Sequence, residues 1–281
     1  MALHRGNDYF RKAYIVYRPS DKCIELAKNV RRALISKGLK VDTFWVDDII
    51  RGAREYVDLI IGIGGDGTLL KISRVYPENT PLILPIPCGR RTILYEDIDL
   101  ENIDEVIDRV INGDFVLEDY DRLHIISPRN SYYALNEAAL VSIDHGRVVR
   151  FEIEMTTPGM CSHLFFYGDG VIVSTSAGSA AYNLSVGGSL LEYSVSGISI
   201  APLNPMELNI KPIIVPRLSK ITIRTHGDAD LYIDGENMET LGRGSHISIE
   251  MDFRSFRIIR LSGRRDVAKK VFDRRRLFFV K

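Results

Sequence analysis

The residues whose types and spacing most clearly suggest a chemical function form one short turn between two apolar segments. The turn reads Gly64, Gly65, Asp66, Gly67 and Thr68. An apolar run at residues 57–63 precedes it and is typical of a buried strand, and apolar residues at helical spacing follow it, with Thr68 or Asp66 near the helix cap. Helix N-termini favour anions, and glycines let a phosphate approach the backbone closely. The turn therefore predicts a phosphate site.

Asp66 is the unusual member of this turn, because a phosphate repels a carboxylate unless a cation lies between them or a proton is available to take. Both conditions describe phosphoryl transfer, in which Mg²⁺ bridges the phosphates and a base orients a hydroxyl group. The alternative is that Asp66 is only a turn or cap residue, since Asp is common in glycine turns.

Gly62, Gly64 and Gly67 also fit the G-x-G-x-x-G fingerprint of dinucleotide-binding dehydrogenases. Two observations oppose that interpretation. Asp66 would face the pyrophosphate, and the acidic residue expected about 20 residues later is missing from LILPIPCGRR at residues 82–91.

Two more polar features lie in the second half of the chain. Asn136 and Glu137 stand in an apolar stretch, so one of them should point inward and need a partner, either a ligand or a protein group. Residues 167–188, YGDGVIVSTSAGSAAYNLSVGG, run from a glycine turn through a strand and a hydroxyl-rich loop into a short helix. This segment is either a place where a ligand meets the backbone or a crossover with small residues for packing.

The first third of the chain alternates strands with helices. Strands are expected at residues 13–17, 39–46, 57–63 and 81–86, and helices after Ser20, after Thr68 and at residues 103–111. This rhythm predicts a Rossmann-like α/β domain with a parallel sheet, at residues 1–113. Ligands of such sheets bind at the carboxyl ends of the strands, where the glycine turn lies.

After Asp114 the pattern becomes extended, which predicts an all-β sandwich at residues 114–261, interrupted by one helix. The expected extended segments are residues 115–127, 131–143, 148–155, 163–174, 213–215, 220–225, 230–233, 246–251 and 256–261. The basic tail, residues 262–281, carries a helical apolar stripe and is expected to return to the first domain rather than to serve as a nucleic-acid arm.

The composition of the chain limits the kinds of partner, compartment and metal that are expected. The 281 residues carry no net charge, so nucleic acid is not an expected partner. We found neither an apolar run of about 18 residues nor a signal peptide, which favours a cytoplasmic protein without membrane contact. Cys23, Cys88 and Cys161 are widely separated without metal-binding spacing, which predicts a reducing compartment and no zinc.

Together, GGDGT, an Asn-Glu pair 70 residues later, GDG with T-x-x-G-S-x-A-Y, and a late Asp-Gly pair resemble the NAD kinase family. Diacylglycerol and sphingosine kinases share GGDGT, but their Asn-Glu pair follows within a few residues. The resemblance implies phosphoryl transfer from ATP or polyphosphate to the 2′-hydroxyl of NAD, giving NADP, with Mg²⁺ or another divalent cation. It also implies a site between the domains, often shared with a neighbouring subunit of a homodimer or homotetramer.

The resemblance assigns roles to individual residues. Asp66 is the catalytic residue, as a base or through the metal. The phosphate-binding residues are Gly64, Gly65, Gly67 and Thr68. The NAD-binding residues are Asn136, Glu137, Asp169, Ser179, Ala181 and Tyr182, and no protein ligand is assigned to the metal.

The chain also departs from the family pattern. Pro87 replaces an asparagine, Ile93 replaces an aromatic residue, and Ala177 and Ala180 replace hydroxyl residues. These changes either weaken NAD binding or indicate a kinase for another hydroxyl metabolite. A non-catalytic nucleotide sensor is a third alternative, which the two carboxylates of the motifs disfavour.

Arg90 and Arg91 are additional cations in the segment after the fourth strand. Arg91 is expected to contact a substrate or donor phosphate, because guanidinium groups match phosphate oxygens. The alternative is that the two arginines form a solvated surface pair.

Overall fold

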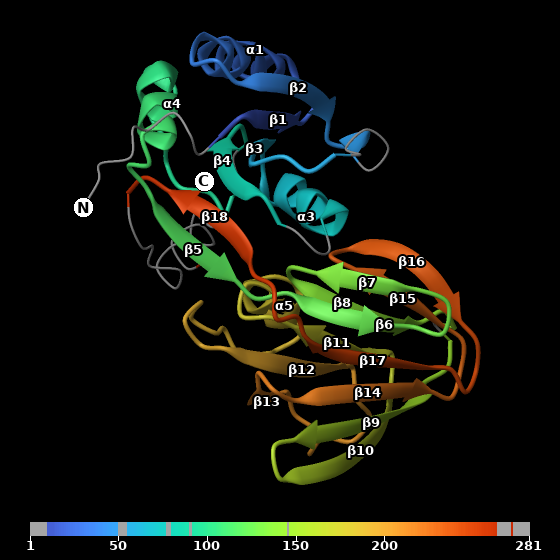
Figure 1. Ribbon diagram of the computed structural model, residues 1–281. Coiled ribbons are helices and arrows are strands. Elements are labelled where there is room, and N and C mark those ends of the chain that lie inside the picture. The colour runs from blue at the N-terminus through green and yellow to red at the C-terminus, as the bar shows by residue number, and fades with distance from the viewer. Residues whose placement is uncertain are drawn as a thin grey trace, which may run out of the picture. The chain divides into compact units, whose positions relative to one another are not determined.

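The computed structural model describes residues 10–49, 55–76, 80–89, 92–144, 146–262 and 271 (Figure 1). The chain forms two compact units, one comprising the described residues up to Asp119 and from Phe256 onward, and the other comprising Tyr120–Ser255. Each unit has its own hydrophobic core. Among the described residues, no helix has the length and apolar character needed to cross a membrane.

The first unit is an α/β fold around a six-stranded sheet, which confirms the predicted class. The strand order is β2-β1-β3-β4-β18-β5, and the pairs β1–β2, β1–β3, β3–β4 and β4–β18 are parallel. The strands are β1 (Lys12–Tyr17), β2 (Lys40–Trp45), β3 (Leu59–Gly64), β4 (Leu82–Pro87), β5 (Val116–Tyr120) and β18 (Phe256–Arg260). The helices are α1 (Asp21–Ser36), α3 (Asp66–Val75) and α4 (Ile103–Ile111).

The helices of the first unit cover both faces of its sheet. Helices α1 and α4 share a core with Ile15, Ile61 and other residues on one face of the strands. On the opposite face, a Cβ atom on Gly62 would lie 3.1 Å from Leu69 and from Ile72 of α3. The glycine therefore lets α3 pack close against β3, which fixes the position of the turn between them.

Strands β5 and β18 differ from expectation. The extended patterns at residues 115–127 and 256–261 are assigned above to the β-domain, but β5 and β18 complete the first sheet beside β4. The buried Arg260 donates from Nε to Glu118 Oε2 at 2.5 Å and joins the two strands. The alternation of side chains shows which face of a strand is buried, and it does not show which sheet the strand joins.

The second unit is an antiparallel β-sandwich, again as predicted. Its sheets have the orders β10-β9-β14-β17-β6-β7 and β13-β12-β11-β8-β15-β16. The first sheet contains β6 (Leu123–Ile126), β7 (Ser131–Ala134), β9 (Val149–Thr157), β10 (Met160–Gly168), β14 (Lys220–Thr225) and β17 (His246–Met251). The second contains β8 (Glu137–Ser142), β11 (Gly170–Ser174), β12 (Gly197–Leu203), β13 (Ile213–Pro216), β15 (Ala229–Ile233) and β16 (Glu236–Leu241). A short 3₁₀ turn, η1 (Gly178–Ala180), and α5 (Tyr182–Ser185) follow β11.

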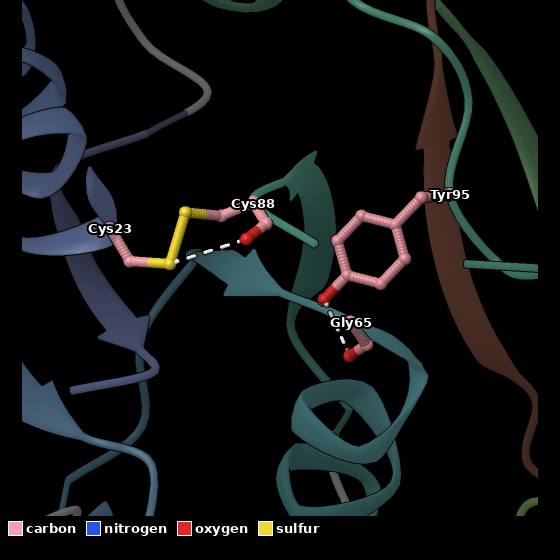
Figure 2. Close-up of a disulfide and its surroundings, with 4 residues drawn as sticks. All are labelled: Cys23, Gly65, Cys88 and Tyr95. Atoms are coloured by element: carbon pink, nitrogen blue, oxygen red, sulfur yellow. Dashed lines mark hydrogen bonds between the residues drawn. A yellow bond between two sulfur atoms is a disulfide. The ribbon is translucent and has the colours of Figure 1, made fainter. Parts of the chain in front are cut away.

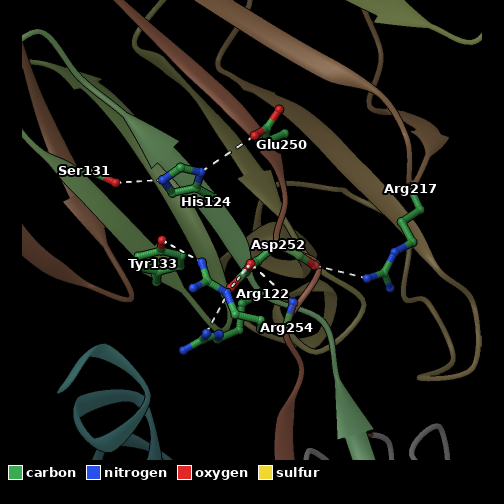
Figure 3. Close-up of polar contacts among 8 residues, drawn as sticks. All are labelled: Arg122, His124, Ser131, Tyr133, Arg217, Glu250, Asp252 and Arg254. Carbon is green, nitrogen blue, oxygen red and sulfur yellow. Dashed lines mark hydrogen bonds and ion pairs between the residues drawn. The ribbon is translucent and has the colours of Figure 1, made fainter. Parts of the chain in front are cut away.

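A buried ion pair lies where the chain enters and leaves the second unit (Figure 3). Arg122 Nη2 donates to Asp252 Oδ2 at 2.9 Å, and the Asp252 N–H donates to the Arg122 carbonyl at 2.8 Å. Arg254 donates to the same carboxylate at 3.1 Å and to the Tyr133 hydroxyl at 3.0 Å. Burial lowers the pKa of the Arg122 guanidinium, while the Asp252 charge opposes that shift. The two ends of the unit are thereby held side by side.

Candidate functional site

The glycine turn connects β3 to α3 in the first unit. Helix α3 begins at Asp66 and its N-cap residue is Gly65, which lies one residue before Asp66 and three before Thr68, the two residues expected near the cap. A Cβ atom on Gly64 would lie 2.2 Å from the Thr68 hydroxyl oxygen, so this glycine is required by local packing. In contrast, apart from its chain neighbours and the backbone of its own helix, no heavy atom of the described chain lies within 4 Å of a Cβ placed on Gly67. Of these two glycines, Gly67 is the one that leaves room for a ligand at the helix N-terminus.

The Asp66 carboxylate is held by backbone groups of the segment after β4. The Ile93 N–H donates to Oδ1 at 3.0 Å and to Oδ2 at 2.8 Å, and the Leu94 N–H donates to Oδ1 at 2.9 Å. Asp66 is also the first residue of α3, where the helix dipole favours a negative charge. These contacts fix the orientation of a charged carboxylate beside the open position at Gly67.

Tyr95 supports the same turn and was not among the predicted residues. Its fully buried hydroxyl donates to the Gly65 carbonyl at 3.0 Å (Figure 2). Burial, and then the Asp66 charge, raise the pKa of Tyr95 well above its ordinary value, so the hydroxyl stays protonated as a donor. No local pattern in the sequence marks this tyrosine, because its partner lies 30 residues away.

A disulfide joins Cys23 and Cys88, with their Cα atoms 5.8 Å apart (Figure 2). The cysteine spacing, from which a reducing compartment was predicted, gave no indication of this bridge. Cys23 lies in the first turns of α1 and Cys88 directly follows β4, so both lie at the carboxyl edge of the parallel sheet. The Cys88 N–H also donates to the Gly64 carbonyl at 2.9 Å, which places the bridge beside the glycine turn.

Arg91, the predicted phosphate contact, lies outside the described residues, and so does Arg90. Residues 263–270 and 272–281 of the tail, where a helix is expected, also lie outside the described residues.

Glu137 is the inward member of the Asn-Glu pair in the second unit. Its side chain is buried, and its Oε2 atom has no hydrogen-bond partner among the described residues. It borders a pocket of about 310 Å³ that is lined by Glu137, Ala139, Val141, Tyr182, Tyr232 and Gly235. Burial, and then the Asp234 charge, raise the pKa of Glu137 to about 8. A buried carboxyl without a protein partner, facing a pocket, favours the ligand over the intramolecular partner.

Asp234 fixes the backbone of this pair. Its carboxylate accepts the N–H groups of Leu135 at 3.0 Å, Asn136 at 2.7 Å and Glu137 at 3.2 Å. Asp234 has a φ of 50° and Gly235 a φ of 82°, the conformation of a two-residue hairpin turn between β15 and β16. The late Asp-Gly pair was the signal that could have identified Asp234 as a positioning residue.

The hydroxyl-rich loop packs directly on the Asn136 backbone. Thr175 donates its hydroxyl to the Leu135 carbonyl at 2.6 Å, and a Cβ atom on Gly178 would lie 2.0 Å from the Asn136 carbonyl oxygen. The hydroxyl-rich loop and the Asn136–Glu137 pair thus lie against each other. Tyr182 follows the loop and is 45% exposed where it lines the pocket with Glu137.

The polar groups in the buried part of this loop form hydrogen bonds with other groups of the protein. The Ser179 hydroxyl donates to the Ser176 carbonyl at 2.6 Å and accepts the Leu191 N–H at 2.9 Å. Ala177 and Ala180, where the family pattern has hydroxyls, are also buried. Ala181 donates its N–H to the Gly178 carbonyl at 2.9 Å. Ser179 therefore shapes the loop, and the exposed Tyr182 is the member that reaches the pocket.

Asp169 lies at the other end of the same sheet. Strand β11 pairs Ser174 with Glu137 and Gly170 with Val141, so Asp169 lies beyond the far end of β8. At about 3.4 Å per residue, the backbones of Asp169 and Glu137 are roughly 17 Å apart. Asn204 Nδ2 donates to the Asp169 carboxylate at 2.8 Å. A single chain does not bring these two predicted NAD contacts together.

Both units match models of one family of kinases. Residues 12–115 match the ATP-NAD kinase N-terminal domain, and residues 135–261 match the ATP-NAD kinase C-terminal domain. The NAD kinase of Methanopyrus kandleri is 32% identical over 241 residues, which cover 78% of this chain and 82% of the relative. The NAD kinase of Thermotoga maritima is 30% identical over 207 residues, with 74% and 77% covered. The chain belongs to the NAD kinase family.

Solved structures support the fold. An NAD kinase from Archaeoglobus fulgidus in complex with ATP superimposes with a TM-score of 0.73 at 24% identity, covering 95% of this chain and 97% of the other. Yeast NADH kinase complexed with NADH gives a TM-score of 0.81 at 20% identity, covering 98% and 89%. At these identities the likeness concerns the fold alone.

Proposed function

We propose that this protein transfers the γ-phosphoryl group of ATP to the 2′-hydroxyl of NAD, giving NADP. The observation that carries the proposal is the fixed Asp66 carboxylate at the N-terminus of α3, next to the open position at Gly67. The choice of ATP and NAD as the two nucleotides rests on the membership of the chain in the NAD kinase family. The first unit then binds the donor phosphates, and the second unit binds NAD.

In this mechanism Asp66 orients the 2′-hydroxyl and accepts its proton while the phosphoryl group moves. The N–H groups at the start of α3 face the donor phosphates and offset their charge. Positioning and charge neutralisation supply most of the rate enhancement in such transfers. The N–H bonds from Ile93 and Leu94 keep the carboxylate in one orientation without engaging a side chain, so the replacement of an aromatic residue by Ile93 leaves this function intact.

A divalent cation such as Mg²⁺ fits this arrangement. Mg²⁺ in kinases is held by one or two carboxylates together with substrate phosphates rather than by a full protein cage. Asp66 supplies the one carboxylate of the turn. When bound, the cation would neutralise charge on the donor phosphates.

For NAD, we propose that Glu137 and Asn136 contact the adenosine half and that Tyr182 contacts it from the rim of the same pocket. The unpartnered Glu137 Oε2 is suited to a ribose hydroxyl. Because Ala177 and Ala180 leave two fewer hydroxyls in the loop, a kinase for another adenosine-like metabolite is the second candidate. Comparing NAD, NADH and such metabolites as acceptors separates the two.

Asp169 completes the site of a neighbouring copy in this proposal, since its own chain places it at the far end of β8. Mixing two inactive variants, Glu137→Gln and Asp169→Asn, tests this role. A homo-oligomer with shared sites recovers part of its turnover on mixing, because some sites then hold two intact contributions. Unchanged inactivity after subunit exchange would place both residues in one chain's site or remove Asp169 from it.

The first test is a coupled assay of NADP formation with NAD, ATP and Mg²⁺. Asp66→Asn is expected to keep the fold and ATP binding but to lose about 10²–10⁴-fold in kcat. Asp21→Asn is the matched control, since Asp21 is likewise the first residue of a helix that follows a parallel strand. Wild-type turnover in the Asp66 variant would contradict the assignment.

A further inference from the structure

A second group of ligand-type side chains lies on the β9–β10 hairpin of the second unit. Glu154, Cys161 and His163 are exposed, and one ligand atom from each lies within 4.8 Å of the other two. Cys161 Sγ is 3.7 Å from His163 Nε2, and His163 Nδ1 is 3.9 Å from Glu154 Oε2. None of the three belongs to the kinase motifs.

The backbone of the hairpin places these side chains on one face. Glu154 and His163 are directly opposite each other in the antiparallel register, and Cys161 lies two residues before His163 on the same face. Their strand neighbours Ile153 and Met155 point to the other face and are buried in the sandwich core. The packed sheet therefore holds three ligands on a rigid base while their side chains remain free to adjust.

We propose that Glu154, Cys161 and His163 bind a divalent transition-metal ion, with Zn²⁺ as the best match. Thiolate, imidazole and carboxylate are zinc ligands, whereas Mg²⁺ and Ca²⁺ require oxygen ligands. Zn–S bonds are about 2.3 Å long and Zn–N and Zn–O bonds about 2.0–2.2 Å, so tetrahedral coordination places the ligand atoms about 3.3–3.6 Å apart. One ion takes only one nitrogen of His163, so the separation that applies is the 4.8 Å limit for one ligand atom from each residue. Rotamer changes of roughly 1–1.5 Å in these exposed side chains bring the atoms into the tetrahedral range.

The charge balance and the access to the site suit such an ion. The Cys161 thiol loses its proton to solvent on binding, so one thiolate and one carboxylate balance the two positive charges. The Thr156 hydroxyl lies 3.8 Å from Cys161 Sγ and can stabilise the thiolate. A surface hollow of about 340 Å³ borders Glu154 and His163, so water could reach an ion bound there. The site is thus a three-ligand centre, which the wide spacing of the cysteines concealed.

Cys161 offers a direct readout, because it is the one cysteine outside the disulfide. Without reductant, iodoacetamide alkylation of the whole protein reports on this thiol alone. Zn²⁺ is expected to slow alkylation at least tenfold, EDTA to restore it, and Mg²⁺ to leave it unchanged. Alkylation that Zn²⁺ does not slow would overturn the proposal.

Calorimetric titration with Zn²⁺ provides the second measurement. Cys161→Ser, His163→Gln and Glu154→Gln are each expected to weaken binding at least tenfold. Glu152→Gln is the matched control, because Glu152 lies on the same face of β9 but pairs with Arg150 and His226. Equal Zn²⁺ affinity in wild type and Cys161→Ser would show that the ion binds elsewhere and would reject the site.

Discussion

Asp234 Oδ1 accepts the backbone N–H of Asn136 at 2.7 Å, across 98 residues of sequence. A hairpin turn thereby determines where the strand that carries Glu137 begins. The same carboxylate accepts two more N–H groups, so one side chain anchors the entire start of β8. Asp234 thus positions the backbone of the pair proposed to bind NAD, and it need not touch the ligand itself.

Replacing Asp234 should therefore damage both stability and NAD binding. Hydrogen bonds to a charged group contribute about 1.5–3 kcal/mol each, and the three at Asp234 share one carboxylate and do not add in full, so Asp234→Ala is expected to lower the free energy of unfolding by at least about 3 kcal/mol. It should also raise the KM for NAD at least tenfold while the KM for ATP changes little. Asp234→Asn tolerates the positive φ and keeps one acceptor oxygen, so its stability and its KM for NAD should lie between those of the wild type and of Asp234→Ala.

The measurements are urea unfolding and initial rates with each nucleotide varied. Asp230→Ala is the control, because this half-buried carboxylate on the same strand accepts a hydrogen bond from the exposed Thr240 hydroxyl and none of the N–H groups at the start of β8. An unchanged KM for NAD in Asp234→Ala would show that the loop keeps its position without the carboxylate.

The raised pKa of Glu137 predicts a pH-dependent stability. Its value of about 8 exceeds the ordinary 4.5, so between these pH values the folded protein holds a proton that the unfolded chain releases. Stability relative to Glu137→Gln is complete below about pH 4.5 and falls as the pH rises toward 8, by at most about 1.4 kcal/mol per pH unit. Urea unfolding from pH 5 to 9 measures this difference. Parallel curves for wild type and Glu137→Gln, with Glu105→Gln as the exposed control, would contradict the shift.

Two glycines of the turn should respond in opposite ways. Gly64→Ala places a methyl group on the Thr68 hydroxyl and is expected to destabilise the protein by about 1–3 kcal/mol. Gly67→Ala meets no heavy atom of the described residues outside its own helix and should improve the helix by about 0.5–1 kcal/mol, yet it should reduce turnover because it occupies the space of a phosphate. Thermal unfolding and the coupled assay separate the two effects. A fully active Gly67→Ala variant would move the phosphate site away from this position.

The Cys23–Cys88 bridge should contribute strongly to stability. It closes a loop of 65 residues, for which chain entropy predicts about 4 kcal/mol and engineered cases commonly give about 2–4 kcal/mol. Dithiothreitol, or Cys88→Ser, should lower the urea midpoint accordingly. Cys161→Ser should leave it unchanged. A wild-type midpoint that is the same with and without reductant would argue that the two thiols contribute nothing through their bond.

Local patterns predicted the parts of the fold that depend on neighbours in sequence. The glycine turn and the helix at residues 103–111 follow from turn chemistry and helical spacing, and the structure has them at the predicted places. The antiparallel sandwich likewise follows from alternation separated by turns. The burial of one member of the Asn136–Glu137 pair also followed from the apolar surroundings, although the sequence did not show that this member is Glu137.

Features that depend on distant contacts could not be found in this way. Strand β12 is buried at every residue and so shows no alternation, and β16, ENMETL, is too polar to stand out. The disulfide, the Tyr95 hydroxyl and the Asp234 carboxylate each act across 30 or more residues. Their partners are set by the order of strands in the sheets, which periodicity does not encode.

The Arg122–Asp252 pair has a consequence for the architecture of the polypeptide. The chain leaves the first unit once, after β5, and returns once, into the adjacent strand β18. Arg122 and Asp252 clamp the outgoing and incoming segments together at 2.9 Å. Topologically, the sandwich is thus an insertion between the neighbouring strands β5 and β18, and the Arg122–Asp252 ion pair holds the two ends of the insertion together. Because the two connections lie in neighbouring strands, the α/β sheet keeps its strand order whatever the length of chain inserted between β5 and β18.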